Sequence, residues 1–176
     1  FKKFNSLTSL YFDQANKLGS KPHLWRKINN KYDYLTWNDT KNHINNLSSS
    51  LINHGILPGD RVFVCCENRP EFFISDVAIM ASGAITVPAY TTNTSSDHEY
   101  IIKHSGCRAA IVSTMEIAKK IIPILSLTKC EFIIIMDKND ENNNESSNIF
   151  SWNDFINKGK ENIVDTLKIY SKQKRT

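Results

Sequence analysis

The sequence has little glycine, and no loop concentrates it. The six glycines stand apart, at positions 19, 55, 59, 83, 106 and 159. A loop that holds nucleotide phosphates needs closely spaced glycines, because backbone N–H groups must approach the anion. Each glycine is better explained as a helix end or a turn. The sequence therefore offers no glycine-rich phosphate loop, and it also lacks the G-x-S-x-G elbow of serine hydrolases.

Cysteine is scarce as well, and its spacing excludes a zinc site. The four cysteines stand at positions 65, 66, 107 and 130, without a C-x-x-C pair. Cys65 and Cys66 are adjacent in an expected strand, so their side chains point to opposite faces. We interpret the cysteines as small buried hydrophobic residues in a reducing compartment.

Long apolar runs and a large excess of one charge are also absent. No span approaches the length of a membrane helix, and no secretory signal is visible. We therefore expect a cytoplasmic protein. The formal net charge is only +4, and the Lys and Arg residues are scattered among acids. Nucleic-acid binding is not indicated by this pattern.

The histidines show no metal-binding pattern. His98 and His104 are six residues apart, so they lie on different faces of a helix, whereas a zinc-binding helical pair is four apart. His43 and His54 are expected on the polar side and at the end of one helix, where a solvated role is the simpler interpretation. His54 would also suit the negative end of the helix dipole.

One charged cluster, Asn68-Arg69-Pro70-Glu71, follows an expected strand. Arg69 could meet an anion there. The simpler interpretation is a capped helix start, with Arg69 and Glu71 solvated, since charge pairs at surfaces usually contribute little. We therefore assign no catalytic, no cofactor-binding and no metal-binding residue from the sequence.

What the sequence does contain is an alternation of buried strands and helices, which predicts an α/β fold. Unbroken short apolar runs suit parallel strands covered on both faces. We expect such strands at 62–66, 84–87, 109–112 and 132–136, and two short N-terminal strands at 23–28 and 32–35 that form an antiparallel hairpin through Asn29-Asn30. We expect helices at 4–18, 36–55, 70–82, 96–105, 116–122, 152–156 and 162–170. The predicted architecture is a mainly parallel sheet flanked by helices on both faces.

Several helix boundaries rest on particular residues. Thr36 with Asp39, and Ser96 with Glu99, fit the capping-box pattern at helix starts. Pro123 is expected to close the helix that begins near Glu116, because proline breaks the helical hydrogen-bond ladder.

The loop Ala89–Thr94 follows the second buried strand and is rich in hydroxyl groups. Ligands of open α/β sheets bind outside the carboxyl ends of strands, so this loop is the best functional candidate by position. A solvated connection is the alternative, because most loops only connect elements.

The length of 176 residues permits one domain or a substantial piece of a larger one. The sequence begins at Phe1 without an initiator Met, so we expect that its natural N-terminus is missing. Residues 137–148 are poor in hydrophobic residues and rich in Asn and acids, which predicts a mobile surface loop.

Five segments in order resemble the N-terminal region of adenylate-forming enzymes, the AMP-dependent synthetase and ligase superfamily. They are Leu35-Thr36-Trp37, 55–62 (GILPGDRV), 67–72 (ENRPEF), 81–84 (ASGA) and 87–90 (VPAY). Within that superfamily, ENRPE and VPAYTT resemble the long-chain fatty acid–CoA ligases. The similarity runs from about Phe4 to Val112 and is weaker beyond.

The resemblance implies that residues 1–176 are part of a large N-terminal AMP-binding domain, with the rest of that domain and a small C-terminal domain absent. It implies a parent enzyme that uses ATP, Mg²⁺ and CoA to convert a fatty acid to acyl-CoA through an acyl-adenylate. The family's phosphate loop, Thr-Glu motif, ribose-binding Asp and C-terminal Lys match no position here, so no catalytic residue is carried over. The fragment alone is expected to be inactive and to bind no cofactor tightly.

The partner implied is the fatty acid, with a homodimer contact and peripheral membrane association as further hypotheses. Two alternatives remain open. One is another adenylate-forming ligase, such as an aryl-CoA ligase or a peptide-synthetase adenylation domain. The other is a flavodoxin-like binding module with no enzymatic role.

Overall fold

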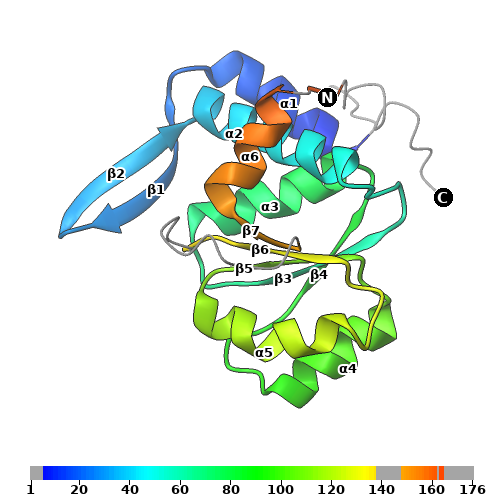
Figure 1. Ribbon diagram of the computed structural model, residues 1–176. Coiled ribbons are helices and arrows are strands. Elements are labelled where there is room, and N and C mark those ends of the chain that lie inside the picture. Colours follow the sequence, from blue (N-terminus) through cyan, green and yellow to red (C-terminus); the bar gives the residue numbers. More distant parts are fainter. Residues whose placement is uncertain (1–5, 138–147, 162, 165–176) are drawn as a thin grey trace.

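The computed structural model describes residues 6–137, 148–161 and 163–164. A parallel sheet lies between two layers of helices, and a two-stranded hairpin extends away from the upper layer (Figure 1). The sheet strands are β3 (Arg61–Cys65), β4 (Ile85–Pro88), β5 (Ala109–Val112), β6 (Phe132–Ile135) and β7 (Ile149–Ser151). The predicted α/β class, the mainly parallel sheet and the N-terminal hairpin are confirmed.

The strands lie in the order β4-β3-β5-β6-β7, and every neighbouring pair is parallel. Strand β7, which directly precedes the helix that begins at Trp152, was not expected. Strand β4 was expected to be buried, but it forms the edge of the sheet among the described residues, and Ile85 is 53% exposed. That prediction is wrong because an apolar run shows only that a strand is compatible with burial. Whether the strand has a hydrogen-bonded neighbour on each side depends on the order of the strands in the sheet.

Alternate residues of each strand enter two separate cores, as the two-residue period of a strand requires. On β3, Val64 faces the core under one helical layer and Phe63 faces the other. The first layer comprises α1 (Leu7–Leu18), α2 (Trp37–Asn53), α3 (Pro70–Ala81) and α6 (Trp152–Glu161). The second comprises α4 (Ser95–Ser105) and α5 (Met115–Leu125). Helices therefore cover both faces of the sheet, as predicted (Figure 1).

Capping explains two helix starts, and one of them differs from expectation. Thr36 accepts a hydrogen bond from the backbone N–H of Asp39, whose carboxylate accepts from the N–H of Thr36, so the predicted capping box is confirmed. Helix α4 is capped by Thr94 with Asp97 in the reciprocal position, not by Ser96 with Glu99. The motif occurs twice in overlapping registers, and the helix begins at the earlier one.

Two helices end later than predicted. Helix α5 continues through Pro123 to Leu125, so the prediction that Pro123 closes it is wrong. The proline lies in the last turn, where the hydrogen-bond ladder that it interrupts is about to end. Helix α6 extends to Glu161 rather than ending at Ile156. The helix expected at 162–170 lies outside the described residues except at Ile163 and Val164, which are not helical. Most of the loop expected at 137–148 also lies outside them.

The hairpin consists of β1 (Pro22–Ile28) and β2 (Lys31–Thr36). Asn29 and Asn30 both have positive φ, at 47° and 62°, which two-residue hairpin turns require and which asparagine tolerates. The predicted hairpin is confirmed.

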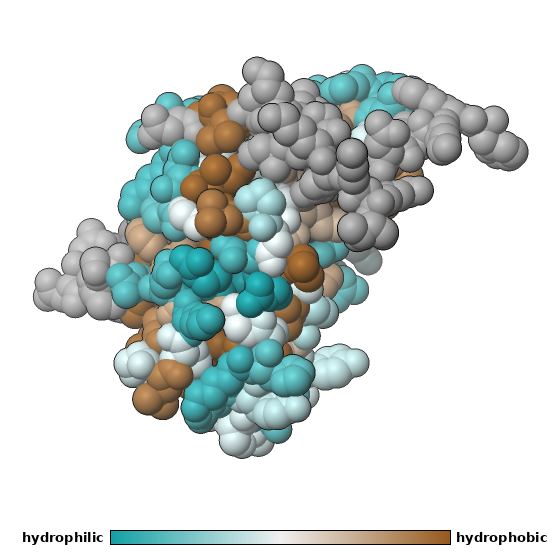
Figure 2. Space-filling view, turned by 90° about the vertical axis from the view of Figure 1, so that its right-hand side faces the viewer, coloured by the Kyte–Doolittle hydropathy of each residue, from teal (hydrophilic) through white to brown (hydrophobic). Residues whose placement is uncertain are grey.

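Hydrophobic and hydrophilic residues are mixed on the surface. On the face in Figure 2, a narrow column of hydrophobic residues lies above a band of hydrophilic ones. Among the helices of the described part of the chain, none combines the length and the apolar character needed to cross a membrane.

Candidate functional site at the carboxyl edge of the sheet

The candidate site lies where the connections from β3 and β5 leave the sheet in opposite directions. Because all five strands are parallel, their carboxyl ends lie at one edge. Helix α3 follows β3 onto one face, and α5 follows β5 onto the other. Neighbouring strands that diverge in this way create the crevice in which open α/β sheets bind ligands.

A bidentate ion pair spans this crevice. Arg69 precedes α3, and its Nη1 and Nη2 atoms donate to the two carboxylate oxygens of Asp137, both at 2.9 Å. Asp137 follows β6, and its backbone N–H donates to the carbonyl of Ser113 at the end of β5. The pair therefore joins the ends of β3 and β6 across the end of β5.

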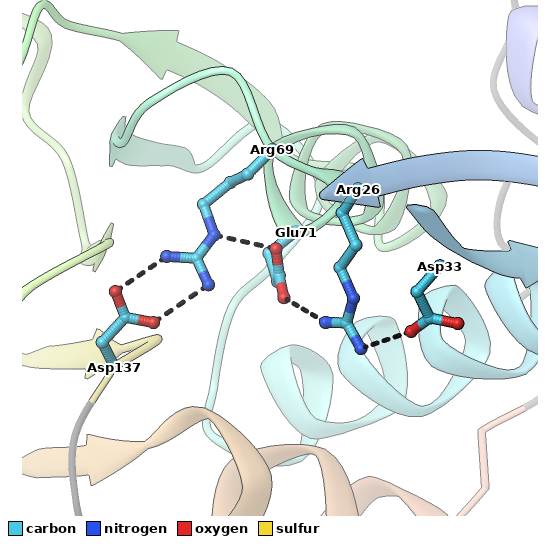
Figure 3. A network of polar contacts seen from close by, with 5 residues as sticks. All are labelled: Arg26, Asp33, Arg69, Glu71 and Asp137. Carbon is cyan, nitrogen blue, oxygen red and sulfur yellow. Dashed lines mark hydrogen bonds and ion pairs between the residues drawn. The ribbon is translucent and has the colours of Figure 1, made fainter. Parts of the chain in front are cut away.

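The ion pair continues into a network that reaches the hairpin (Figure 3). Arg69 Nε donates to Glu71 at 2.8 Å, and Glu71 also lies 3.8 Å from Arg26 of β1. Arg26 in turn contacts Asp33 of β2 at 3.4 Å. The expectation that Arg69 and Glu71 are solvated is wrong: their side chains are only 25% and 14% exposed.

The surroundings of Arg69 favour its charged form. The hydrogen bonds to Asp137, and after them the contacts with Glu71, raise the pKa of Arg69 against the opposing effect of burial. Charge-assisted bidentate pairs of this kind are stronger and more directional than single contacts. Arg69 is therefore occupied by protein carboxylates and is not presented as a free anion ligand.

A cavity of about 400 Å³ lies beside this network, at the ends of β3 and β4. Its wall is mainly apolar and includes Cys66, Phe72, Pro88 and Tyr90, with Glu67 and Asn68 at the polar side. The volume falls in the range of small-molecule sites. The loop predicted as the functional candidate, Ala89–Thr94, thus contributes its first two residues to a cavity at the carboxyl edge.

A larger hollow of about 770 Å³ lies at the opposite, amino-terminal edge. Among the residues around it, Arg108 and Glu131 pair with each other at 2.5 Å. We do not regard this hollow as the site, because ligands of open α/β sheets bind at the carboxyl ends of the strands.

The cysteines near the carboxyl edge are not activated nucleophiles. Burial, and after it the charge of Glu67, raises the pKa of Cys65 to about 11 and that of Cys66 to about 12. Both thiols therefore stay protonated near neutral pH, and a thiol reacts only as its thiolate. This agrees with their interpretation as small hydrophobic residues.

The histidines do not converge on a site. His98 is fully buried on α4, neither ring nitrogen is hydrogen-bonded to a residue that the structure describes, and its ring meets Phe63 edge to face at 5.5 Å. His104 stacks on Tyr100 instead. His54 ends α2 and packs on Phe155, with its Nδ1 2.8 Å from the carbonyl of Ser50, so its ring is not simply solvated. Among the described residues, no group of three or more His, Cys, Asp or Glu side chains could hold a metal ion.

Sequence reasoning noticed Arg69 but missed its partner. Asp137 was placed in the loop expected at 137–148, 68 residues further along the chain. The available signal was positional: both residues come shortly after buried parallel strands, and such positions meet at one edge of the sheet.

The chain matches the family of AMP-binding enzymes over residues 11–168. It is 28% identical over 163 residues to a long-chain-fatty-acid–CoA ligase of Homo sapiens, covering 92% of this chain and 24% of that protein. It is 29% identical over 165 residues to long chain acyl-CoA synthetase 1 of Arabidopsis thaliana, covering 88% of this chain and 24% of that protein. The chain thus spans about a quarter of the length of these curated relatives.

Solved structures share the fold. A coronafacic acid ligase from Pectobacterium brasiliense superposes with a TM-score of 0.75 at 21% identity, covering 85% of this chain and 29% of that one. The adenylation domain of a carboxylate reductase from Mycobacterium chelonae superposes with a TM-score of 0.78 at 16% identity, covering 91% and 30%. Since the family match extends over most of its length, this chain belongs to the AMP-binding enzymes.

Proposed function

We propose that this chain is the N-terminal portion of a long-chain fatty acid–CoA ligase. The observation that carries the proposal is that curated relatives aligned along nearly the whole chain include long-chain acyl-CoA ligases from an animal and a plant. Each is matched over about a quarter of its own length, which is what a partial AMP-binding domain would give.

The proposed reaction has two steps. The fatty acid carboxylate attacks the α-phosphorus of ATP, and pyrophosphate leaves, which forms the acyl-adenylate. The CoA thiolate then attacks the acyl carbonyl carbon and AMP leaves, which forms acyl-CoA. Such a site needs donors and a cation for the phosphate charge and an apolar space for the chain.

The described residues supply a framework for this chemistry rather than its reacting groups. The parallel sheet offers a carboxyl edge with an apolar cavity and a clamp of carboxylates and arginines. The proposal assigns Mg²⁺ to none of the described residues. The catalytic groups would lie elsewhere in the complete polypeptide.

The test is to express the complete polypeptide and to offer it carboxylic acids of different classes. We expect release of pyrophosphate and formation of acyl-CoA with long-chain fatty acids, in the presence of ATP, Mg²⁺ and CoA. Activity with aryl acids alone, or aminoacyl-adenylate formation without CoA transfer, would instead support another adenylate-forming ligase.

A second measurement concerns this chain by itself. Isothermal titration of residues 1–176 with ATP is expected to show no binding in the micromolar range. Clear micromolar binding would show a self-sufficient nucleotide site, and the proposal that the chain is an inactive portion of a larger enzyme would then fail.

A further inference from the structure

We propose that Arg69 is a positioning residue for the ligase reaction, acting through its clamp on Asp137. This inference rests on the proposed function. The clamp fixes the spacing between the ends of β3 and β6 at the edge of the sheet that faces the crevice (Figure 3). It therefore sets the shape of the edge against which substrates would be held.

The bidentate Arg69–Asp137 pair links two strands, and we call it the tie. Strand β5 lies between β3 and β6. Asp137 is held to the end of β5 by its backbone N–H, which donates to the carbonyl of Ser113 at 2.8 Å, and to Arg69 by both carboxylate oxygens. Three consecutive strand ends are thus linked through one aspartate.

Arginine is the residue type that this tie requires. Its planar guanidinium makes two parallel contacts to Asp137 while its Nε donates to Glu71 at the first turn of α3. A lysine carries only a point charge and would lose the fixed orientation. The cavity-lining residues Asn68 and Phe72 lie immediately beside Arg69 and Glu71 in the chain, so a change in the tie reaches the cavity wall directly.

The rate of a reaction is sensitive to small shifts in substrate orientation. A mutation far from the reacting atoms that misplaces the substrate by about 1 Å can lower the rate roughly 100-fold. Single exposed ion pairs contribute little to folding, whereas a bidentate pair within a network contributes more. Loss of the tie should therefore lower both kcat and Tm, and the fall in kcat is the readout of a positioning role.

The chain contains a matched control at the other edge of the sheet. Arg108 pairs with Glu131 at 2.5 Å and also lies 3.7 Å from Asp60, so it too contacts two acids. The exposed fractions of Arg108 and Glu131 are 27% and 54%, against 25% and 49% for Arg69 and Asp137. This pair joins the starts of β5 and β6, away from the carboxyl edge.

The experiment uses the complete polypeptide, with steady-state kinetics of acyl-CoA formation and thermal unfolding measured for each variant. For Arg69→Ala and Asp137→Ala we expect kcat to fall by about tenfold or more, with KM for ATP nearly unchanged. Arg69→Lys should recover only part of the loss. For Arg108→Ala, which removes a single hydrogen bond to Glu131 rather than a bidentate pair, we expect a smaller fall in Tm and a change in kcat within about twofold.

Equal kcat for Arg69→Ala and Arg108→Ala, in an active wild-type enzyme, would overturn the inference and leave the proposed function standing. Full recovery by Arg69→Lys would also overturn it, because the bidentate geometry would then be irrelevant. A wild-type protein that forms no acyl-adenylate from any acid would overturn the proposed function, and the inference with it.

Discussion

Gly159 lies directly against the backbone of Asn46, in the contact between α6 and α2. A Cβ placed on Gly159 would come within 1.9 Å of the carbonyl oxygen of Asn46 and 3.0 Å of the backbone nitrogen of Ser50. Gly159 was expected to be a helix end or a turn, and that prediction is wrong. It lies inside α6, where the absence of a side chain allows the two helices to touch.

Replacing Gly159 by alanine should therefore destabilise the protein. Alanine at an ordinary helix position would add up to about 1 kcal/mol of stability relative to glycine. Here overpacking against a backbone should reverse the sign and cost about 1–3 kcal/mol. Urea unfolding of Gly159→Ala measures the effect. The control is Asn157→Ala on the exposed side of α6, which should change stability by less than about 0.5 kcal/mol.

The start of α4 distinguishes two overlapping capping motifs. Thr94 accepts a hydrogen bond from the N–H of Asp97 at 3.3 Å, so Thr94→Ala should cost about 1 kcal/mol. Ser96 lies inside the helix, and Ser96→Ala should be close to neutral. Thermal unfolding of both variants decides between them. The reverse order of effects would restore Ser96 as the cap.

The buried imidazole of His98 should make the fold sensitive to acid. Burial, and after it the positive charge of Lys120, lowers the pKa of His98, with Asp97 opposing. The native state therefore resists a proton that the unfolded chain accepts, so stability should be lost as the pH falls below about 6.5, the unfolded value. Above that pH, His98 does not make the free energy of unfolding depend on pH.

The measurement is the free energy of unfolding in urea between pH 7.5 and pH 5.5, for the wild type and for His98→Leu. The wild type should lose stability more steeply, by at most about 1.4 kcal/mol per pH unit for a single proton. His23 and His43, whose pKa values burial also lowers, are present in both proteins, so the difference between them reports His98. Parallel pH profiles would contradict the prediction.

The edge strand β4 should make the isolated chain self-associate. Ile85 is 53% exposed on this strand, and unpaired strand edges are templates for pairing with another chain. Sedimentation velocity of residues 1–176 should show oligomers, and Ile85→Lys should shift them towards monomer. Leu127→Lys, at a hydrophobic residue 61% exposed after the end of α5 rather than on a strand, should leave the oligomers unchanged. A monodisperse wild-type monomer would contradict the prediction.

Local patterns predicted most elements of this fold. Unbroken apolar runs identified β3, β5 and β6, and the Asn29-Asn30 pair identified the hairpin turn. These predictions succeeded because the signals act over a few residues, through side-chain alternation and through φ values that few residue types accept.

Predictions failed where the decision depended on distant parts of the chain. Whether β4 is central or at an edge cannot be read from its own segment, because the partners of a strand come from elsewhere in the chain. The candidate site shows the same limit, since Arg69 looked solvated until the fold placed Asp137 beside it.

The amino-acid sequence by itself determined the α/β class, because the period of apolar residues chooses between strand and helix within each segment. Only the tertiary structure decided the strand order, the packing of Gly159 on Asn46 and the partner of Arg69. These features arise from contacts between segments that are far apart in the chain, and such contacts form only when the strands align side by side, bring their ends to a common edge and let the helices pack on one another.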